Sequence, residues 1–302
     1  MYMDSLDNFP TLEEFLSYSN EEIQNFTRKF SIKTCYLPVD GTRRHFILYS
    51  SSVSSWNESH LQDYYKHVNE NFRTILSQFY DYGLQDIIVL LMDKSAFSRG
   101  KAFLTETIKN GIKPLYEDSA YVDLYNKYNI EVYFSGFNEV YKTYYEPELL
   151  EELERNFEKL KRPKGDRKLL VYTGLSPSED YLLFERLAQD LRRENIPVTK
   201  ENMIKKIYHT NLSAIDFSIW FGYPRDKLIP PLLWEDGTNL FIKNPTLTLK
   251  PVQIKKAIYY SAITKDSIKD KYFNHNFTEQ KKNTLLNEVQ STDAIMGEEY
   301  YL

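Results

Sequence analysis

Strand patterns and helix patterns alternate along most of this 302-residue chain, and this alternation is the feature that most restricts its fold. Short runs of aliphatic and aromatic residues are separated by longer stretches whose apolar residues recur at helical spacing. Because parallel strands need long crossover connections, the pattern predicts an α/β domain with a single, mostly parallel six-stranded sheet flanked by helices. The predicted strands are 34–39, 86–92, 131–134, 168–172, 214–221 and 239–243.

Between these strands, apolar residues recur at the spacing of an α-helix. The predicted helices are 60–82, 98–110, 119–128, 147–160, 177–193, 201–208 and 251–263. An N-terminal helical segment, 1–30, precedes the main domain, 31–265, and a C-terminal extension, 266–302, follows it. The turn-rich segment 162–166 is interpreted as a surface loop rather than as a boundary between domains.

Charge and cysteine content exclude several classes of function. The formal net charge is −5, which disfavours a general electrostatic hold on nucleic acid. Cys35 is the single cysteine, so no internal disulfide and no cysteine-based metal cluster can form. The acidic start does not resemble a signal peptide, and no run approaches the roughly 18 apolar residues of a membrane span. We therefore expect a cytoplasmic protein without a membrane span.

The 25 tyrosines and 18 phenylalanines could line a hydrocarbon pocket or simply fill the core and surface.

The segment Asp40-Gly41-Thr42-Arg43-Arg44 directly follows the first predicted strand. In open parallel sheets, ligands bind beyond the carboxyl ends of the strands. Backbone N–H groups at a helix start and arginine forks both match phosphate oxygens, and a neighbouring carboxylate can hold Mg²⁺ or handle a proton. The alternative is an ordinary Asp-Gly turn followed by two arginines on a solvated helix face.

The segment 37–44 resembles the diphosphate motif of the cis-prenyltransferases, and its Thr-Arg-Arg ending is most similar to tuberculosinol synthases, also called tuberculosinyl adenosine transferases. Weaker similarity covers 86–100, 129–136 and 214–263. The resemblance implies a cis-prenyltransferase-like fold in which Asp40 positions the leaving group, directly or through Mg²⁺. It also implies that Gly41, Thr42, Arg43 and Arg44 bind the diphosphate of an allylic isoprenoid substrate.

Further positions take roles from the same resemblance. Arg99 ends a segment similar to one in which the family's arginine binds the allylic diphosphate, although it could equally be a solvent-facing arginine. Tyr64 could face an allylic cation, or it could be a core aromatic residue of an amphipathic helix. The expected lining of the substrate pocket consists of Phe97, Phe103, Trp220 and Tyr223. Phe103 stands where tuberculosinol synthases carry a tyrosine.

The late part of the chain departs from the family pattern for isopentenyl diphosphate. Trp220 replaces the first arginine of the family's late diphosphate-binding segment, and Asn239 replaces its magnesium-binding glutamate. The loss of an arginine fork and of a carboxylate weakens any second diphosphate site. Ionisation without chain elongation is therefore the expected chemistry.

The expected function is that of a terpene synthase or prenyl-group transferase acting on a farnesyl-sized to geranylgeranyl-sized or cyclised diterpenyl diphosphate. Water, a nucleophile such as adenosine, or an internal alkene could capture the cation. Two alternatives stay open: an elongating cis-prenyltransferase with a rebuilt site around Arg225, and a non-catalytic accessory subunit. The resembling families also imply a homodimer, with 251–263 as a candidate interface.

The histidines offer no clear site. His60 and His67 are seven residues apart, whereas metal-binding pairs on a helix are three or four apart, so both are interpreted as surface residues. His45 follows the motif and could touch a phosphate, but a lone histidine is more often an ordinary polar side chain.

Overall fold

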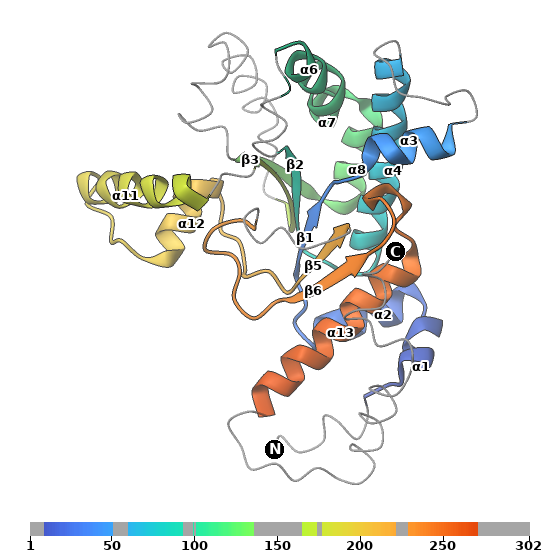
Figure 1. Ribbon diagram of the computed structural model, residues 1–302. Coiled ribbons are helices and arrows are strands. Elements are labelled where there is room, and N and C mark those ends of the chain that lie inside the picture. The colour runs from blue at the N-terminus through green and yellow to red at the C-terminus, as the bar shows by residue number, and fades with distance from the viewer. Residues whose placement is uncertain are drawn as a thin grey trace.

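Six parallel strands form one sheet at the centre of the molecule (Figure 1). A computed structural model describes residues 9–50, 60–92, 99, 101–135, 165–173, 177–221 and 229–270. The order in the sheet is β3-β4-β2-β1-β5-β6, and every neighbouring pair runs parallel. The bounds are β1 Thr34–Pro38, β2 Asp86–Met92, β3 Ile130–Ser135, β4 Arg167–Thr173, β5 Phe217–Phe221 and β6 Thr238–Ile242. The predicted α/β class and six-stranded sheet are confirmed.

The central strands are apolar on both sides because helices or loops cover both faces of the sheet. All five residues of β1 are buried, as are six of the seven residues of β2. Their register places Leu37 opposite Val89, so the two strands end side by side. The edge formed by these carboxyl ends is where a ligand site is expected in this topology.

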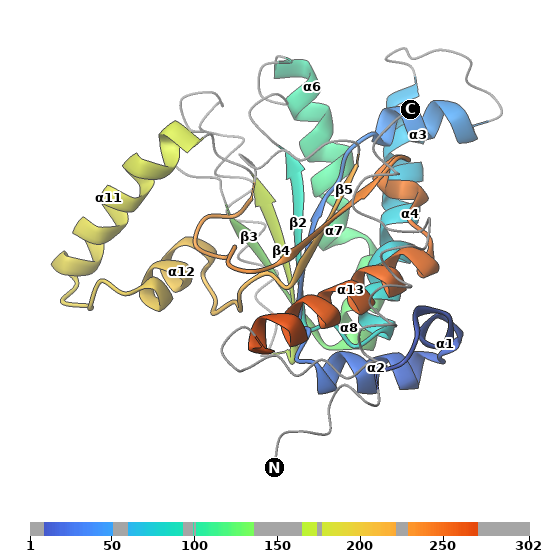
Figure 2. The same ribbon diagram turned by 60° about the horizontal axis from the view of Figure 1, so that its bottom comes forward.

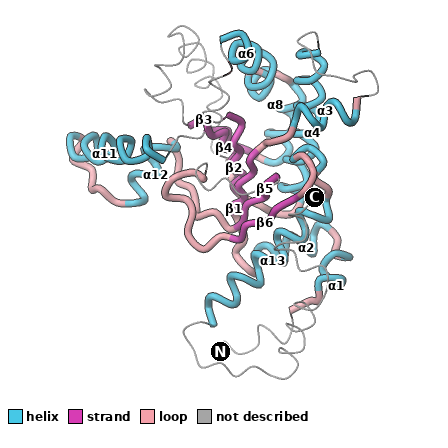
Figure 3. Tube along the Cα trace, in the orientation of Figure 1, coloured by secondary structure: helices cyan, strands magenta, loops and turns pink. Residues whose placement is uncertain are grey.

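Helices occupy the connections between strands (Figure 3). Their bounds are α1 Leu12–Ser17, α2 Asn20–Lys29, α3 Thr42–Tyr49, α4 Leu61–Asp81, α6 Lys101–Glu106, η2 Thr107–Ile112, α7 Pro114–Glu117, α8 Ser119–Tyr128, α11 Pro177–Arg193, α12 Lys200–Tyr208, η4 Thr246–Thr248 and α13 Pro251–Asp270. None of the helices within the described ranges is both long and apolar enough to cross a membrane.

The larger core lies between the sheet and α4, α8 and α13, and the N-terminal helices close it. Capping boxes at Thr11 and Ser19 begin α1 and α2. Phe15 is fully buried between Phe26 and Tyr259 of α13, so the N-terminal segment packs into the same core as the sheet (Figure 2). One face of α13 is likewise buried in its own chain, including Ile254 and Ile258.

A smaller core covers the opposite face of the sheet. Tyr36 and Tyr172 of the strands pack there with Tyr208 of α12 and Leu233 of the following loop. α11 packs against α12 and extends away from the sheet (Figures 1 and 2). Most of the fully buried large side chains in the two cores are aromatic, and seven are tyrosines, so much of the tyrosine excess fills the core rather than a ligand cavity.

Several predicted bounds need correction. The predicted helix 98–110 is two elements, α6 and the π-helix η2, which continues to Ile112. α13 runs seven residues further than the predicted 251–263, to Asp270. β5 starts at Phe217 rather than at 214, because the N–H of Ile215 bonds to the carbonyl of Leu233 instead of to a strand, and pairing with β1 begins only with the bond from the Asp216 N–H to the carbonyl of Thr34. The predicted helix 147–160 lies outside the described residues.

Candidate active site

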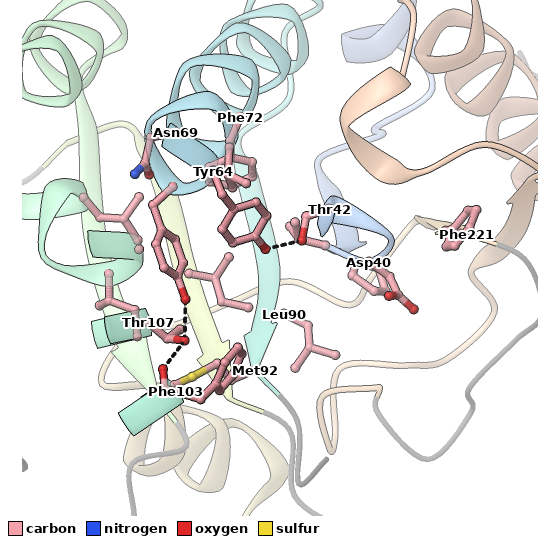
Figure 4. Close-up of a pocket in the computed structure, with 18 of the residues that line it drawn as sticks. Asp40, Thr42, Tyr64, Asn69, Phe72, Leu90, Met92, Phe103, Thr107 and Phe221 are labelled. Atoms are coloured by element: carbon pink, nitrogen blue, oxygen red, sulfur yellow. Dashed lines mark hydrogen bonds between the residues drawn. The ribbon is translucent and has the colours of Figure 1, made fainter. Parts of the chain in front are cut away.

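A cavity of about 160 Å³ opens at the carboxyl ends of β1 and β2 (Figure 4). Its walls come from the end of β1, the start of α3, one face of α4, and α6 with η2. Apolar side chains such as Phe72, Leu90 and Leu115 line much of it, and polar groups gather near Asp40 and near Thr107. An apolar cavity with a few convergent polar groups is typical of small-molecule sites.

The carboxyl end of β1 is tied to a segment more than 200 residues away. The Thr246 hydroxyl donates to the carbonyl of Pro38 at 3.0 Å and accepts from the N–H of Asp40 at 3.1 Å. The N–H of Thr246 in turn donates to the carbonyl of Asp40 at 3.1 Å. These bonds hold the backbone on both sides of the Asp40 side chain, so its direction is set by the fold.

Gly41 is the residue that turns the chain from β1 into α3. Its φ of +70° lies in the left-handed region, and its N–H donates to Asp40 Oδ1 at 2.6 Å. A Cβ at Gly41 would lie 3.0 Å from Phe221 Cε1 and 3.0 Å from Pro245 Cβ. The left-handed backbone conformation and the lack of room for a Cβ therefore both favour glycine at position 41. α3 has no side-chain N-cap, and the first N–H groups of a helix lack partners within the helix, which favours an anion at this end.

Three arginines stand around this helix start. Arg43 and Arg44 are exposed in the first turn of α3, and Arg99 is exposed and lines the cavity. The Arg44 guanidinium lies 5.2 Å from the Phe221 ring, and that of Arg99 lies 5.0 Å from the Phe103 ring. Aromatic rings thus hold two of the positive charges beside the cavity, where a diphosphate could be bound.

Tyr64 connects α4 to the motif. Its hydroxyl shares a hydrogen bond of 2.6 Å with the Thr42 hydroxyl (Figure 4), and its ring contacts the edge of Phe46 in α3. Burial raises the pKa of Tyr64, partly offset by the Thr42 hydrogen bond and the charges of Arg43 and Arg99. The neutral phenol lines the cavity and at the same time fixes the position of α3 on α4.

The polar groups at the other end of the cavity were missed by sequence reasoning. Tyr65 bonds to Thr107 through their hydroxyls at 2.7 Å, and Asn69 accepts from the Tyr121 hydroxyl at 3.2 Å. Tyr65, Asn69 and Phe72 recur at helical spacing on α4, and all three line the cavity. That spacing could have indicated a shared face, but nothing local indicated which element would stand opposite to it.

The prediction that His60 and His67 are surface residues needs correction, because both are only partly exposed and α3 packs against His67. His45 is 4% exposed, and its Nδ1 lies 2.8 Å from Nε2 of His67. Burial and the neighbouring His67 lower the pKa of His45 to about 4, and burial also lowers the pKa of His67. His60 is half-buried at the start of α4, with a buried Nδ1. The two paired imidazoles are neutral at physiological pH and help to hold α3 in place.

Trp220 and Asn239, the two departures from the family pattern, contact each other across β5 and β6. The indole N–H of Trp220 lies 2.5 Å from the Ser218 hydroxyl and 3.1 Å from Asn239 Oδ1. The Ser218 hydroxyl also donates to Asn239 Oδ1 at 2.5 Å. Trp220 contributes to the cavity lining at the strand end, but its indole is 2% exposed and packs against Tyr36 on the other face of the sheet. A neutral, closed hydrogen-bonded cluster therefore occupies these positions.

The remaining predicted residues divide by where they lie. Phe103 lines the cavity, as expected. Phe97, Tyr223 and Arg225 lie outside the described residues, so their predicted roles stay predictions.

The carboxylates that line the cavity determine how Mg²⁺ could bind there. Among the described residues that line the cavity, Asp40 is the one carboxylate. No group of three His, Cys, Asp or Glu side chains suited to a metal ion exists within the described ranges. Mg²⁺ often binds through one or two carboxylates together with substrate phosphates, so Asp40 fits an ion that arrives with a diphosphate better than a resident one.

Comparison with known proteins provides evidence for the fold of this chain and not for its function. No protein-family model matches the sequence, and no curated protein matches it either. The structure is similar to lavandulyl diphosphate synthase from Lavandula x intermedia, solved with dimethylallyl diphosphate, with a TM-score of 0.56 and 13% identity over 78% of this chain and 96% of that chain. It is also similar to a probable undecaprenyl diphosphate synthase from Campylobacter jejuni, with a TM-score of 0.52 and 14% identity over 76% and 94%. The predicted cis-prenyltransferase-like fold is confirmed.

Proposed function

We propose that this protein is an enzyme that ionises an allylic isoprenoid diphosphate and releases diphosphate, as a terpene synthase or prenyl-group transferase. The observation that carries the proposal is the Asp40–Arg44 turn, whose Asp40 and Thr42 line a cavity with both apolar and polar walls. The apolar walls suit a hydrocarbon chain, and the turn suits the charged group at its end. The two solved structures of similar fold are named as prenyl diphosphate synthases, and one holds an allylic diphosphate.

The reaction needs stabilisation of negative charge as the carbon–oxygen bond breaks. The guanidinium groups of Arg43, Arg44 and Arg99, together with the N-terminus of α3, would hold the diphosphate and favour its departure. Asp40 would hold Mg²⁺, which would supply further positive charge when bound. The aromatic rings of Tyr64 and Phe103 line the cavity, where their faces can stabilise an allylic cation.

The Trp220–Asn239 cluster supports ionisation without chain elongation. An indole and an amide provide neither the positive charge for a second diphosphate nor a carboxylate for its metal ion. The Trp220 N–H and Asn239 Oδ1 bond to each other and to Ser218, so both already have partners without a ligand. We therefore propose that one diphosphate binds, and that isopentenyl diphosphate is not a substrate.

The test is to incubate the pure protein with farnesyl, geranylgeranyl and labdane-type diphosphates, with and without Mg²⁺ and adenosine, and to measure diphosphate release. Release that falls at least about a hundredfold in Asp40→Asn, but not in Asp190→Asn, a matched variant of a half-buried aspartate on α11, supports the proposal. If folded protein releases no diphosphate from any of these substrates, the proposal is wrong. Incorporation of labelled isopentenyl diphosphate would instead identify an elongating enzyme.

A further inference from the structure

A pair of hydroxyls lines the cavity, and the proposed ionisation does not use it. The Tyr65 hydroxyl lies 2.7 Å from Thr107 Oγ1, and Thr107 Oγ1 lies 2.8 Å from the carbonyl oxygen of Phe103, as the dashed lines in Figure 4 show. Tyr65 is 5% exposed, and all three residues line the cavity. The pair therefore stands on the part of the cavity wall that α4 and η2 form, near the amide of Asn69.

The hydroxyl protons of Tyr65 and Thr107 determine which further hydrogen bond the Tyr65 oxygen can make. Thr107 has one hydroxyl proton, and it donates this proton to the Phe103 carbonyl. Tyr65 must therefore donate its own proton to Thr107, which leaves its oxygen with acceptor capacity only. Burial raises the pKa of Tyr65 to about 12, so the phenol keeps this proton at neutral pH. A ligand at this oxygen has to be a hydrogen-bond donor.

The local backbone holds this arrangement in place. η2 is a π-helix, a form that is rare and often marks functional sites, and its Gly111 faces the ring of Tyr65. A Cβ at Gly111 would lie 3.1 Å from Tyr65 Cε1, so glycine allows this close approach. The nearby amide of Asn69 is already engaged, since it donates to the Asn110 carbonyl and accepts from Tyr121. On this wall of the cavity, Tyr65 is thus positioned to accept one more hydrogen bond.

We propose that the Tyr65 oxygen, oriented by Thr107, accepts a hydrogen bond from a water molecule that captures the allylic cation, so that the product is a prenyl alcohol. The inference rests on the proposed function and specifies its acceptor. A water that donates to Tyr65 turns a lone pair toward the centre of the cavity, where the cation forms.

The step balances without a further reactant. The carbon–oxygen bond to the diphosphate breaks, and the diphosphate leaves with the electron pair. The water oxygen then forms the new carbon–oxygen bond and gives one proton to a diphosphate oxygen. Tyr65 keeps its own proton, because its bond leads only to Thr107 and to a carbonyl, which is a weak base. Tyr65 is therefore a catalytic residue toward the water, and Thr107 is a positioning residue.

The experiment measures the ratio of prenyl alcohol to alkene formed from geranylgeranyl diphosphate in isotopically labelled water. Label in the wild-type alcohol, and a ratio at least about tenfold lower in Tyr65→Phe, are the expected results, since a hydrogen bond is worth about that factor. Thr107→Val should also lower the ratio, because it frees the Tyr65 proton to point at the water, and Thr107→Ser should restore it.

Tyr125→Phe is the matched control, because Tyr125 is equally buried and its hydroxyl donates to the Leu115 carbonyl at 2.8 Å. It loses one buried hydrogen bond at a residue that does not line the cavity, and the product ratio should stay unchanged. A wild-type enzyme that releases diphosphate but forms no labelled alcohol overturns the inference and leaves the proposed function standing. An unchanged ratio in Tyr65→Phe, or an equal fall in Tyr125→Phe, also overturns it. Absence of diphosphate release in the wild type rejects the proposed function itself.

Discussion

Replacement of Gly41 by alanine tests whether the geometry of one glycine controls both stability and activity. At φ +70°, a residue with a Cβ costs roughly 1 to 2 kcal/mol. The added Cβ also meets Phe221 and Pro245 at 3.0 Å, inside the 3.5 to 4.0 Å at which carbon atoms attract. We expect Gly41→Ala to lower the free energy of unfolding by about 2 kcal/mol, which a domain of this size tolerates.

Gly83 provides the matched control for this variant. Its φ of +87° lies in the same region, and a Cβ there would lie 3.2 Å from the backbone of Gln24, so Gly83→Ala should cost a similar free energy. Gly83 ends α4 on the far side from the cavity, whereas Gly41 joins Asp40 to the arginines. A comparison of the two variants therefore distinguishes an effect of reduced stability from an effect of displacing Asp40 and the arginines.

The assays are urea unfolding followed by circular dichroism and release of diphosphate under conditions where both variants stay folded. A displacement of about 1 Å in a positioning element can cost about a hundredfold in rate, so Gly41→Ala should lose about that factor in kcat/KM. Gly83→Ala should stay within about threefold of the wild type. Equal activity in the two variants, or a Gly41→Ala protein as stable as the wild type, would refute the reasoning.

Three further perturbations test other parts of the structure. The pKa of buried His45 is about 4, so the unfolded state binds more protons than the folded state below pH 6.5. Between pH 7.5 and 5.5, the free energy of unfolding measured in urea should therefore fall by about 1 kcal/mol more in the wild type than in His45→Phe. Equal falls in the two proteins would contradict this. Thr246→Val removes the two hydroxyl bonds to the backbone on the N-terminal side of Asp40; it should cost about 1 to 3 kcal/mol and raise KM for the diphosphate, and an unchanged KM would show that Asp40 is held by other contacts. Phe15→Ala should cost about 3 to 5 kcal/mol in the same unfolding assay, and a cost below about 1 kcal/mol would place the N-terminal helices outside the common core.

The strands and the diphosphate motif could be predicted because their signals are local. A buried parallel strand needs a short apolar run, and the run Ile87–Leu91 could form little else between two turns. Asp40 directly follows such a run, so its place at the carboxyl edge of the sheet follows from the strand itself. The sequence does not predict the division of 98–110 into two elements, because the change from α-helix to π-helix depends on the contacts with α4.

Side-chain partners that are distant in the sequence could not be predicted in this way. His67 appeared to be a surface residue because helical spacing on α4 alone does not show that α3 covers that face. The pairing of Tyr65 with Thr107 spans 42 residues and depends on how η2 packs against α4. The contact of Trp220 with Asn239 depends on the register between β5 and β6.

The amino-acid sequence by itself determined the α/β class, the six strands and the position of the Asp40–Arg44 turn at a strand end, because apolar runs and turn residues act over a few neighbouring positions. Only the tertiary structure decided which hydroxyls face the cavity and which polar residues satisfy one another. Those outcomes depend on register and on helix packing, and packing brings together residues whose local sequences carry no information about each other.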